Sequence, residues 1–145
     1  MGERSLRRRL SAALVPVLIA ALFGCSRSSP PVVQGDVRVA SITVGRNLAP
    51  DETIASDSQT NLFWTTDTFY VSVKTEGSAP SAILQVRWSY QDGTVVAEST
   101  KTIHPKGGEV VAFQASKPDR WTPGDYAVEV FLNGVSAGTK DLNAR

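Results

Sequence analysis

From residue 36 onward, hydrophobic and polar residues alternate with a period of two, which is typical of strands that bury one face. The alternating runs are short, and segments rich in Gly, Asp, Asn and Pro separate them and favour turns. The 3.6-residue apolar period of an amphipathic helix does not occur in this part of the sequence. The pattern predicts strands at 36–46, 68–75, 82–90, 94–104, 109–116, 126–132 and 135–142.

About seven short strands at regular spacing indicate an all-β fold, a sandwich of two antiparallel sheets. In the first strand we expect Val37, Val39, Ser41 and Thr43 to share one face. Asp92-Gly93 and Asn133-Gly134 are expected to form tight hairpins with positive φ angles. The polar stretch 51–67 breaks the alternation and is expected to be a long surface loop or an irregular crossover.

The first 24 residues have the order of parts found in an export signal. Four arginines within residues 4–9 precede an uncharged apolar run from Leu10 to Phe23. This run of 14 residues is shorter than the roughly 20 that a membrane-spanning helix needs, and it contains Pro16. We therefore expect it to direct export and to be removed.

The run ends in Leu22-Phe23-Gly24-Cys25, which resembles the lipobox of bacterial lipoproteins, although Phe23 is bulkier than the usual residue. The resemblance implies that a peptidase recognises Leu22 and Gly24 and cuts before Cys25. It also implies that lipid is attached to the Cys25 sulfur and anchors the protein. Cys25 is the only cysteine in the chain, so no internal disulfide can form.

The sequence therefore divides into a signal peptide (1–24), a lipidated cysteine with a tether (25–35) and a β-sandwich domain (36–145). The tether is rich in Ser and contains Pro30-Pro31, and it is short enough to hold the domain near the membrane. Ser26 follows the cysteine. In Gram-negative lipoproteins, an Asp at this position resembles an inner-membrane retention signal. In a Gram-negative cell we expect the protein at the outer membrane, facing the periplasm.

Two positions favour an immunoglobulin-like sandwich. Tyr126 begins the 126–132 strand after Pro123-Gly124-Asp125, which resembles the tyrosine corner of such domains. Trp88 lies on the third strand, in the place of their core tryptophan, whereas Val128 occupies the place of their second cysteine. Segments 88–93 and 121–134 also look like the small immunoglobulin-like domains of bacterial envelope lipoproteins.

Charge and chemistry exclude several functions. From Cys25 onward the chain has 11 basic and 13 acidic residues and lacks the basic stripe that nucleic-acid binding requires. His104 is the only histidine, and no Gly-x-Ser-x-Gly motif accompanies it. The acidic residues of 51–67 do not have the spacing of an EF-hand. We expect a protein that is not an enzyme and that binds no cofactor or metal.

The aromatic residues Trp64, Trp121 and Tyr70 are the candidate contacts for a partner or ligand, because exposed aromatics anchor proteins or stack on sugars. Alternatively, loop aromatics of this kind fold over the end of the sandwich. The leading hypothesis is a lipid-anchored domain that binds a protein or another envelope component. The second hypothesis is a carbohydrate-binding module that uses these exposed aromatics.

Overall fold

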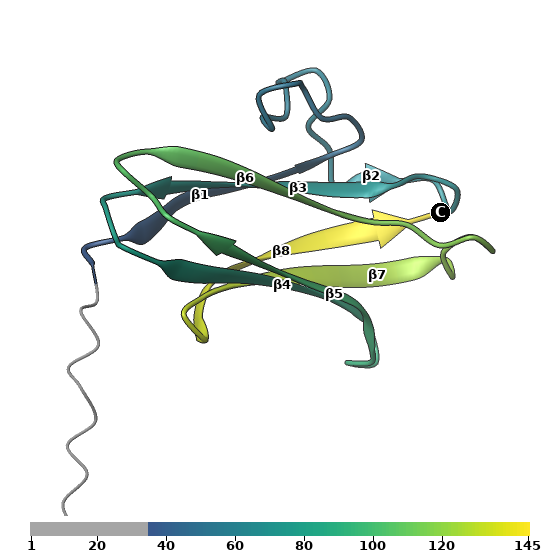
Figure 1. Cartoon of the computed structure of the whole chain (residues 1–145). Coiled ribbons are helices and arrows are strands. Elements are labelled where there is room, and N and C mark those ends of the chain that lie inside the picture. The colour runs from purple at the N-terminus through teal and green to yellow at the C-terminus, as the bar shows by residue number, and fades with distance from the viewer. Residues whose placement is uncertain (1–34) are drawn as a thin grey trace, which may run out of the picture. The chain divides into compact units, whose positions relative to one another are not determined.

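The computed structural model describes residues 35–145, which form strands joined by turns and loops (Figure 1). Leu22, Gly24 and Cys25, the signal peptide and most of the tether lie outside the described residues. The strands are β1 (Arg38–Gly45), β2 (Leu62–Phe63), β3 (Phe69–Glu76), β4 (Ala82–Tyr90), β5 (Val95–Ile103), β6 (Glu109–Ala115), β7 (Gly124–Leu132) and β8 (Val135–Ala144).

The strands form two sheets that face each other across one hydrophobic core, with strand orders β1-β3-β6 and β2-β8-β7-β4-β5. Trp88 is 1% exposed and is among the largest buried side chains. The predicted all-β sandwich is confirmed, as is the core position of Trp88. The predicted strands correspond to β1 and β3 to β8, with bounds that agree to within two residues.

Strand β2 was not predicted, and it makes one sheet mixed rather than purely antiparallel because β2 runs parallel to β8. The carbonyl of Phe63 accepts the N–H of Arg145 at 3.0 Å, and the N–H of Thr65 donates to the carbonyl of Arg145 at 3.2 Å. A segment of this length is too short to show a period of two. Its only sequence signal is the apolar triplet Leu62-Phe63-Trp64 within a polar stretch.

The predicted face of the first strand is wrong after Val39, since a β-bulge lies between Val39 and Ser41 in the pairing with β3. The extra residue shifts the side chains by one position, so that Ile42 and Val44 pack against the core in place of Ser41 and Thr43. The sequence contains the sign of this shift, because its apolar positions step by three between residues 39 and 42.

The two predicted hairpin turns differ in the structure. Asn133 and Gly134 have φ angles of 50° and 80°, so this two-residue turn is confirmed. In the other hairpin only Gly93 has a positive φ, of 85°, and four residues, 91–94, connect β4 to β5. The Asp92 carboxylate accepts the N–H of Thr94 at 2.8 Å, and this hydrogen bond lowers the pKa of Asp92.

The strap, which we define as residues 46–61, lies across the outer face of the β1-β3-β6 sheet (Figure 1). The Ser72 hydroxyl donates to the carbonyl of Glu52 at 2.8 Å, and the N–H of Ala112 donates to Glu52 Oε2 at 3.1 Å. Ser72 and Ala112 are buried although both face away from the core. Of the two expectations for residues 51–67, the irregular crossover is confirmed, because the segment packs on the sandwich and passes from β1 in one sheet to β2 in the other.

Replacing Glu52 with alanine is expected to lower the free energy of unfolding by about 1–2 kcal/mol, because the buried N–H of Ala112 loses its acceptor. Urea unfolding measures this difference. Asp57→Ala is the matched control, since it removes an exposed carboxylate from the same strap. Equal unfolding midpoints for the two variants would show that the contact between Glu52 and Ala112 contributes nothing.

Candidate functional site

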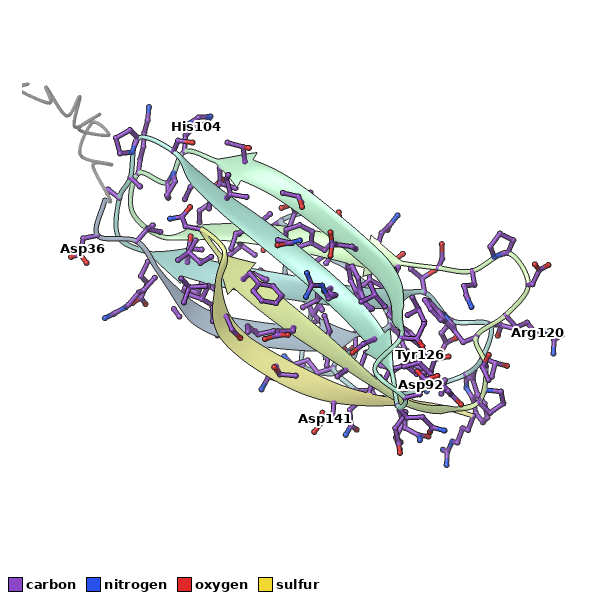
Figure 2. All side chains as sticks on the ribbon, turned by 90° about the horizontal axis from the view of Figure 1, so that it is seen from below. Asp36, Asp92, His104, Arg120, Tyr126 and Asp141 are labelled. Atoms are coloured by element: carbon purple, nitrogen blue, oxygen red, sulfur yellow. The ribbon has the colours of Figure 1, made fainter. Side chains whose placement is uncertain are left out.

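The loops of the sandwich gather at two opposite ends. We call the end far from Gly35 the distal end. It comprises the β2–β3 loop (64–68), the β4–β5 turn (91–94), the β6–β7 loop (116–123) and Arg145. The proximal end comprises Gly35 and the β3–β4, β5–β6 and β7–β8 connections. Figure 2 shows Asp36 and His104 at one end, and Asp92, Arg120 and Tyr126 at the other.

An aromatic cluster closes the core beneath the distal end. The rings of Phe69 and Trp121 stack with centroids 4.3 Å apart and planes within 8° of parallel. The ring of Tyr126 meets both of them edge-on, at 5.6 Å and 5.5 Å. Phe63 packs against Phe69 at a centroid distance of 4.6 Å. The cluster joins both sheets, because Phe69 belongs to β3 and Tyr126 to β7.

Trp121 is buried in this cluster with 2% of its surface exposed, so the expectation of a partner contact at Trp121 is wrong. Its indole N–H donates to the carbonyl of Asp67 at 2.8 Å, and its backbone N–H donates to the carbonyl of Thr65 at 2.8 Å. Trp121 folds over the end of the sandwich, which was the alternative interpretation of the loop aromatics. Its hydrogen bonds hold the β2–β3 loop in place.

Tyr126 forms the predicted tyrosine corner, since its hydroxyl donates to the carbonyl of Thr122 at 2.7 Å. Burial raises the pKa of the Tyr126 hydroxyl, and the neighbouring Tyr90 hydroxyl adds to the rise. Tyr90 also donates to the carbonyl of Pro123, at 2.9 Å. A β-carbon on Gly124 would lie 2.7 Å from the Tyr90 oxygen, so this packing requires glycine at position 124.

Trp64 is exposed, at 53% of its surface, so its expected exposure is confirmed, and its role as a partner contact stays a prediction. Leu62 is 40% exposed and lies two residues earlier in the same extended segment, with the fully buried Phe63 between them. Alternate residues of a strand share a face, so Leu62 and Trp64 form one apolar surface, which we call the Leu62–Trp64 ridge. Sequence reasoning missed Leu62, because it assigned residues 51–67 to a loop or crossover and predicted no strand there.

Hydrogen bonds and an ion pair fix the backbone of the ridge. The Asp67 carboxylate accepts the N–H of Trp64 at 2.8 Å and lies 3.0 Å from Arg46 Nε. The Arg46 guanidinium also donates to the carbonyl of Leu62 at 2.6 Å. The guanidinium of Arg145 lies 5.4 Å from the centre of the Trp64 ring, within the range of a cation–π interaction. These contacts hold the backbone of the ridge and place a cation beside the Trp64 ring.

Tyr70 lies on the outer face of β3, where it is half-buried. It lines a cavity of about 350 Å³ with residues of the strap, of β5 and of β6, and Trp64 is not part of this lining. The structure therefore does not bring Tyr70 and Trp64 into one site. Tyr70 belongs to the side of the sandwich that the strap covers.

His104 and the acidic side chains were the remaining candidates for catalysis or metal binding. His104 Nδ1 lies 2.7 Å from the carbonyl oxygen of Pro80, and the side chain is exposed. Within residues 35–145, no cluster of three His, Cys, Asp or Glu side chains could hold a metal ion. The same residues contain no helix that is long and apolar enough to cross a membrane.

No protein-family model and no curated protein matches this chain. Among solved structures, it is similar to an immunoglobulin-like protein from Pseudomonas aeruginosa, with a TM-score of 0.53 and 17% identity over 78% of this chain and 99% of that one. The chain has an immunoglobulin-like fold.

Two further structures share the fold. The C-terminal domain of Wzt matches with a TM-score of 0.52 and 12% identity, over 77% of this chain and 75% of that one. The alkylpurine DNA glycosylase AlkC from Pseudomonas fluorescens, bound to DNA with an abasic site analogue, matches with a TM-score of 0.50 and 15% identity over 75% of this chain. This chain spans 30% of the glycosylase. At these identities the likeness concerns the fold alone.

Proposed function

We propose that this chain is a lipoprotein, anchored through Cys25, whose immunoglobulin-like domain is a non-catalytic module that binds a protein of the cell envelope. The observation that carries the proposal is the exposed and rigidly held Leu62–Trp64 ridge at the distal end. Exposed tryptophans on a fixed backbone are frequent anchors of protein interfaces, because little side-chain entropy is lost when they bind.

The lipobox-like segment and the position of the ridge agree with a domain that is anchored at one end and exposes the ridge at the other. Residues 26–34 separate Cys25 from Gly35, the first described residue, and an extended segment of this length reaches about 30 Å. Gly35 lies at the proximal end, whereas the ridge lies at the distal end. An anchored domain would therefore present Leu62 and Trp64 to the periplasm. Ser26 supports placement at the outer membrane of a Gram-negative cell.

The geometry favours a protein partner over a carbohydrate. Sugar binding by stacking needs an open aromatic face, but the guanidinium of Arg145 lies over the Trp64 ring and Trp121 is buried. Trp64 is also absent from the linings of five surface cavities formed by residues 35–145. A protruding Leu and Trp beside a cation suit a complementary apolar pocket on another protein.

Replacing Trp64 with alanine is expected to weaken partner binding about 30-fold or more, which corresponds to about 2 kcal/mol for a central interface tryptophan. The partner is first captured in intact cells with a photo-crosslinking amino acid at Leu62, and its affinity for each variant is then measured with the purified proteins. Trp64→Ala should leave the unfolding midpoint nearly unchanged, because more than half of this side chain is exposed.

Val95 provides the control position for the crosslinking. It is 50% exposed and follows the β4–β5 turn at the same end of the sandwich, but it is not part of the ridge. The proposal requires crosslinks from position 62 that are absent from position 95 and reduced by Trp64→Ala. The same products from both positions, or no effect of Trp64→Ala, would refute the ridge as the binding site.

A further inference from the structure

The proximal end carries two strongly exposed apolar side chains. Val135 is 67% exposed and Ile83 is 47% exposed. The N–H of Ile83 donates to Asn133 Oδ1 at 2.9 Å, and its carbonyl accepts the N–H of Asn133 at 2.8 Å. These bonds hold Ile83 beside the Asn133-Gly134 turn, and Val135 follows that turn directly.

The two side chains lie on opposite sides of the turn. Ile83 faces outward from the five-stranded sheet, since its neighbours Ala82 and Leu84 are buried in the core. Val135 pairs with Leu132 and lines a groove of about 630 Å³, whose other wall is the chain from Gly35 to Val39. The tip of the hairpin is therefore flanked by an apolar side chain on each side.

We infer that Ile83 and Val135 dock the proximal end onto the lipid surface, so that the domain rests on the membrane in a fixed orientation. This inference rests on the lipid anchor of the proposed function. The chain leaves the described domain at Gly35, beside Val135, and nine residues separate Gly35 from Cys25. An anchored chain therefore keeps a large apolar phase, the lipid surface, within about 30 Å of these side chains.

The charges of the proximal end favour an apolar contact over an electrostatic one. Arg38 forms an ion pair with Glu76, and the exposed groups Lys106 and Asp36 have opposite signs. A surface of mixed charge gains little binding free energy from anionic lipid headgroups. Docking through Ile83 and Val135 should therefore occur on vesicles of pure phosphatidylcholine and should change little with ionic strength.

The test uses a fluorescent reporter of lipid contact. Lipidation consumes the thiol of Cys25, the only cysteine, so Val135→Cys supplies the single free thiol of the lipidated full-length protein. This thiol is labelled with the environment-sensitive dye NBD, and the protein is reconstituted in phosphatidylcholine vesicles with or without brominated acyl chains. Val95→Cys is the matched control, because it replaces an exposed valine beside the turn at the distal end. Ile83→Cys is a second proximal probe.

At positions 135 and 83 we expect a blue-shifted emission on vesicles and at least twofold quenching by brominated lipid, whereas position 95 should show neither. Equal responses at positions 135 and 95 would overturn the inference while leaving the anchor intact. A blue shift at position 135 in the unlipidated Cys25→Ser chain without vesicles would also overturn it, because the chain itself would then cover the valine. Protein that does not sediment with vesicles would refute the anchor, and the inference with it.

Discussion

Replacing Trp121 with alanine is expected to lower the free energy of unfolding by about 3–5 kcal/mol, the usual cost of truncating a buried tryptophan. The ring stacks on Phe69 and meets Tyr126 edge-on, so its removal opens a cavity where the two sheets join. The change also removes the hydrogen bond from the indole N–H to the carbonyl of Asp67. For a domain of this size, a loss of this order is a large part of the total stability.

Urea or thermal unfolding of the variant measures this loss, and Trp64→Ala is the matched control. Both variants remove an indole from the distal end, but Trp121 is 2% exposed and Trp64 is 53% exposed. The structure predicts a large loss for the first and a loss below about 1 kcal/mol for the second. Equal losses for the two variants would contradict the assignment of Trp121 to the core and of Trp64 to the surface.

Replacing Cys25 with serine is expected to move the protein from the membrane fraction to the soluble fraction. The serine variant is exported behind a signal peptide whose cleavage does not depend on lipid, because the lipoprotein peptidase acts on the lipid-modified cysteine and would otherwise leave the apolar run 10–23 in place. A serine hydroxyl does not accept the thioether-linked lipid, so the mature variant has no acyl chain to anchor it. Two or three acyl chains hold a protein firmly, whereas a single chain binds only reversibly, so the expected change is from nearly complete retention to nearly complete release. Fractionation of cells that express each variant measures it.

Ser26→Asp is the control, because it changes the neighbouring residue but retains the cysteine. By resemblance to Gram-negative lipoproteins, this variant should stay in the membrane fraction and shift from the outer to the inner membrane. Persistence of the Cys25→Ser protein in the membrane fraction would show that something other than lipid at Cys25 retains the chain.

The alternation of apolar residues was enough to predict β1, β3, β4, β6 and β7, because each of these strands turns one face toward the core. Strands β5 and β8 are mostly exposed, and the hairpin signals Asp92-Gly93 and Asn133-Gly134 before them helped to place them. Trp88 and Tyr126 could be placed in the core because each lies in phase with buried neighbours on its strand. The bulge at Ala40, the strand β2 and the packing of the strap depend on pairing between distant segments. The contact between Glu52 and Ala112, for example, joins residues 60 positions apart.

The candidate site could be predicted only in part. Trp64 and Trp121 both stand in polar stretches beside strands, so local sequence does not separate the buried one from the exposed one. The difference in burial comes from tertiary contacts, because Trp121 stacks on Phe69 and donates hydrogen bonds to the 64–68 loop. The contribution of Leu62 became visible only once β2 placed it on the same face as Trp64.

The mass of the N-terminal peptide tests the central claim, that a lipid on Cys25 holds this immunoglobulin-like domain at a membrane. The protein is purified from bacterial membranes and digested with trypsin, which cuts after Arg27. We predict a fragment that begins at Cys25 and carries a diacylglyceryl group, with an acylated amine where the host performs that step. A peptide from the region before Cys25 that is still joined to it, or a Cys25 with a free thiol, would contradict the claim.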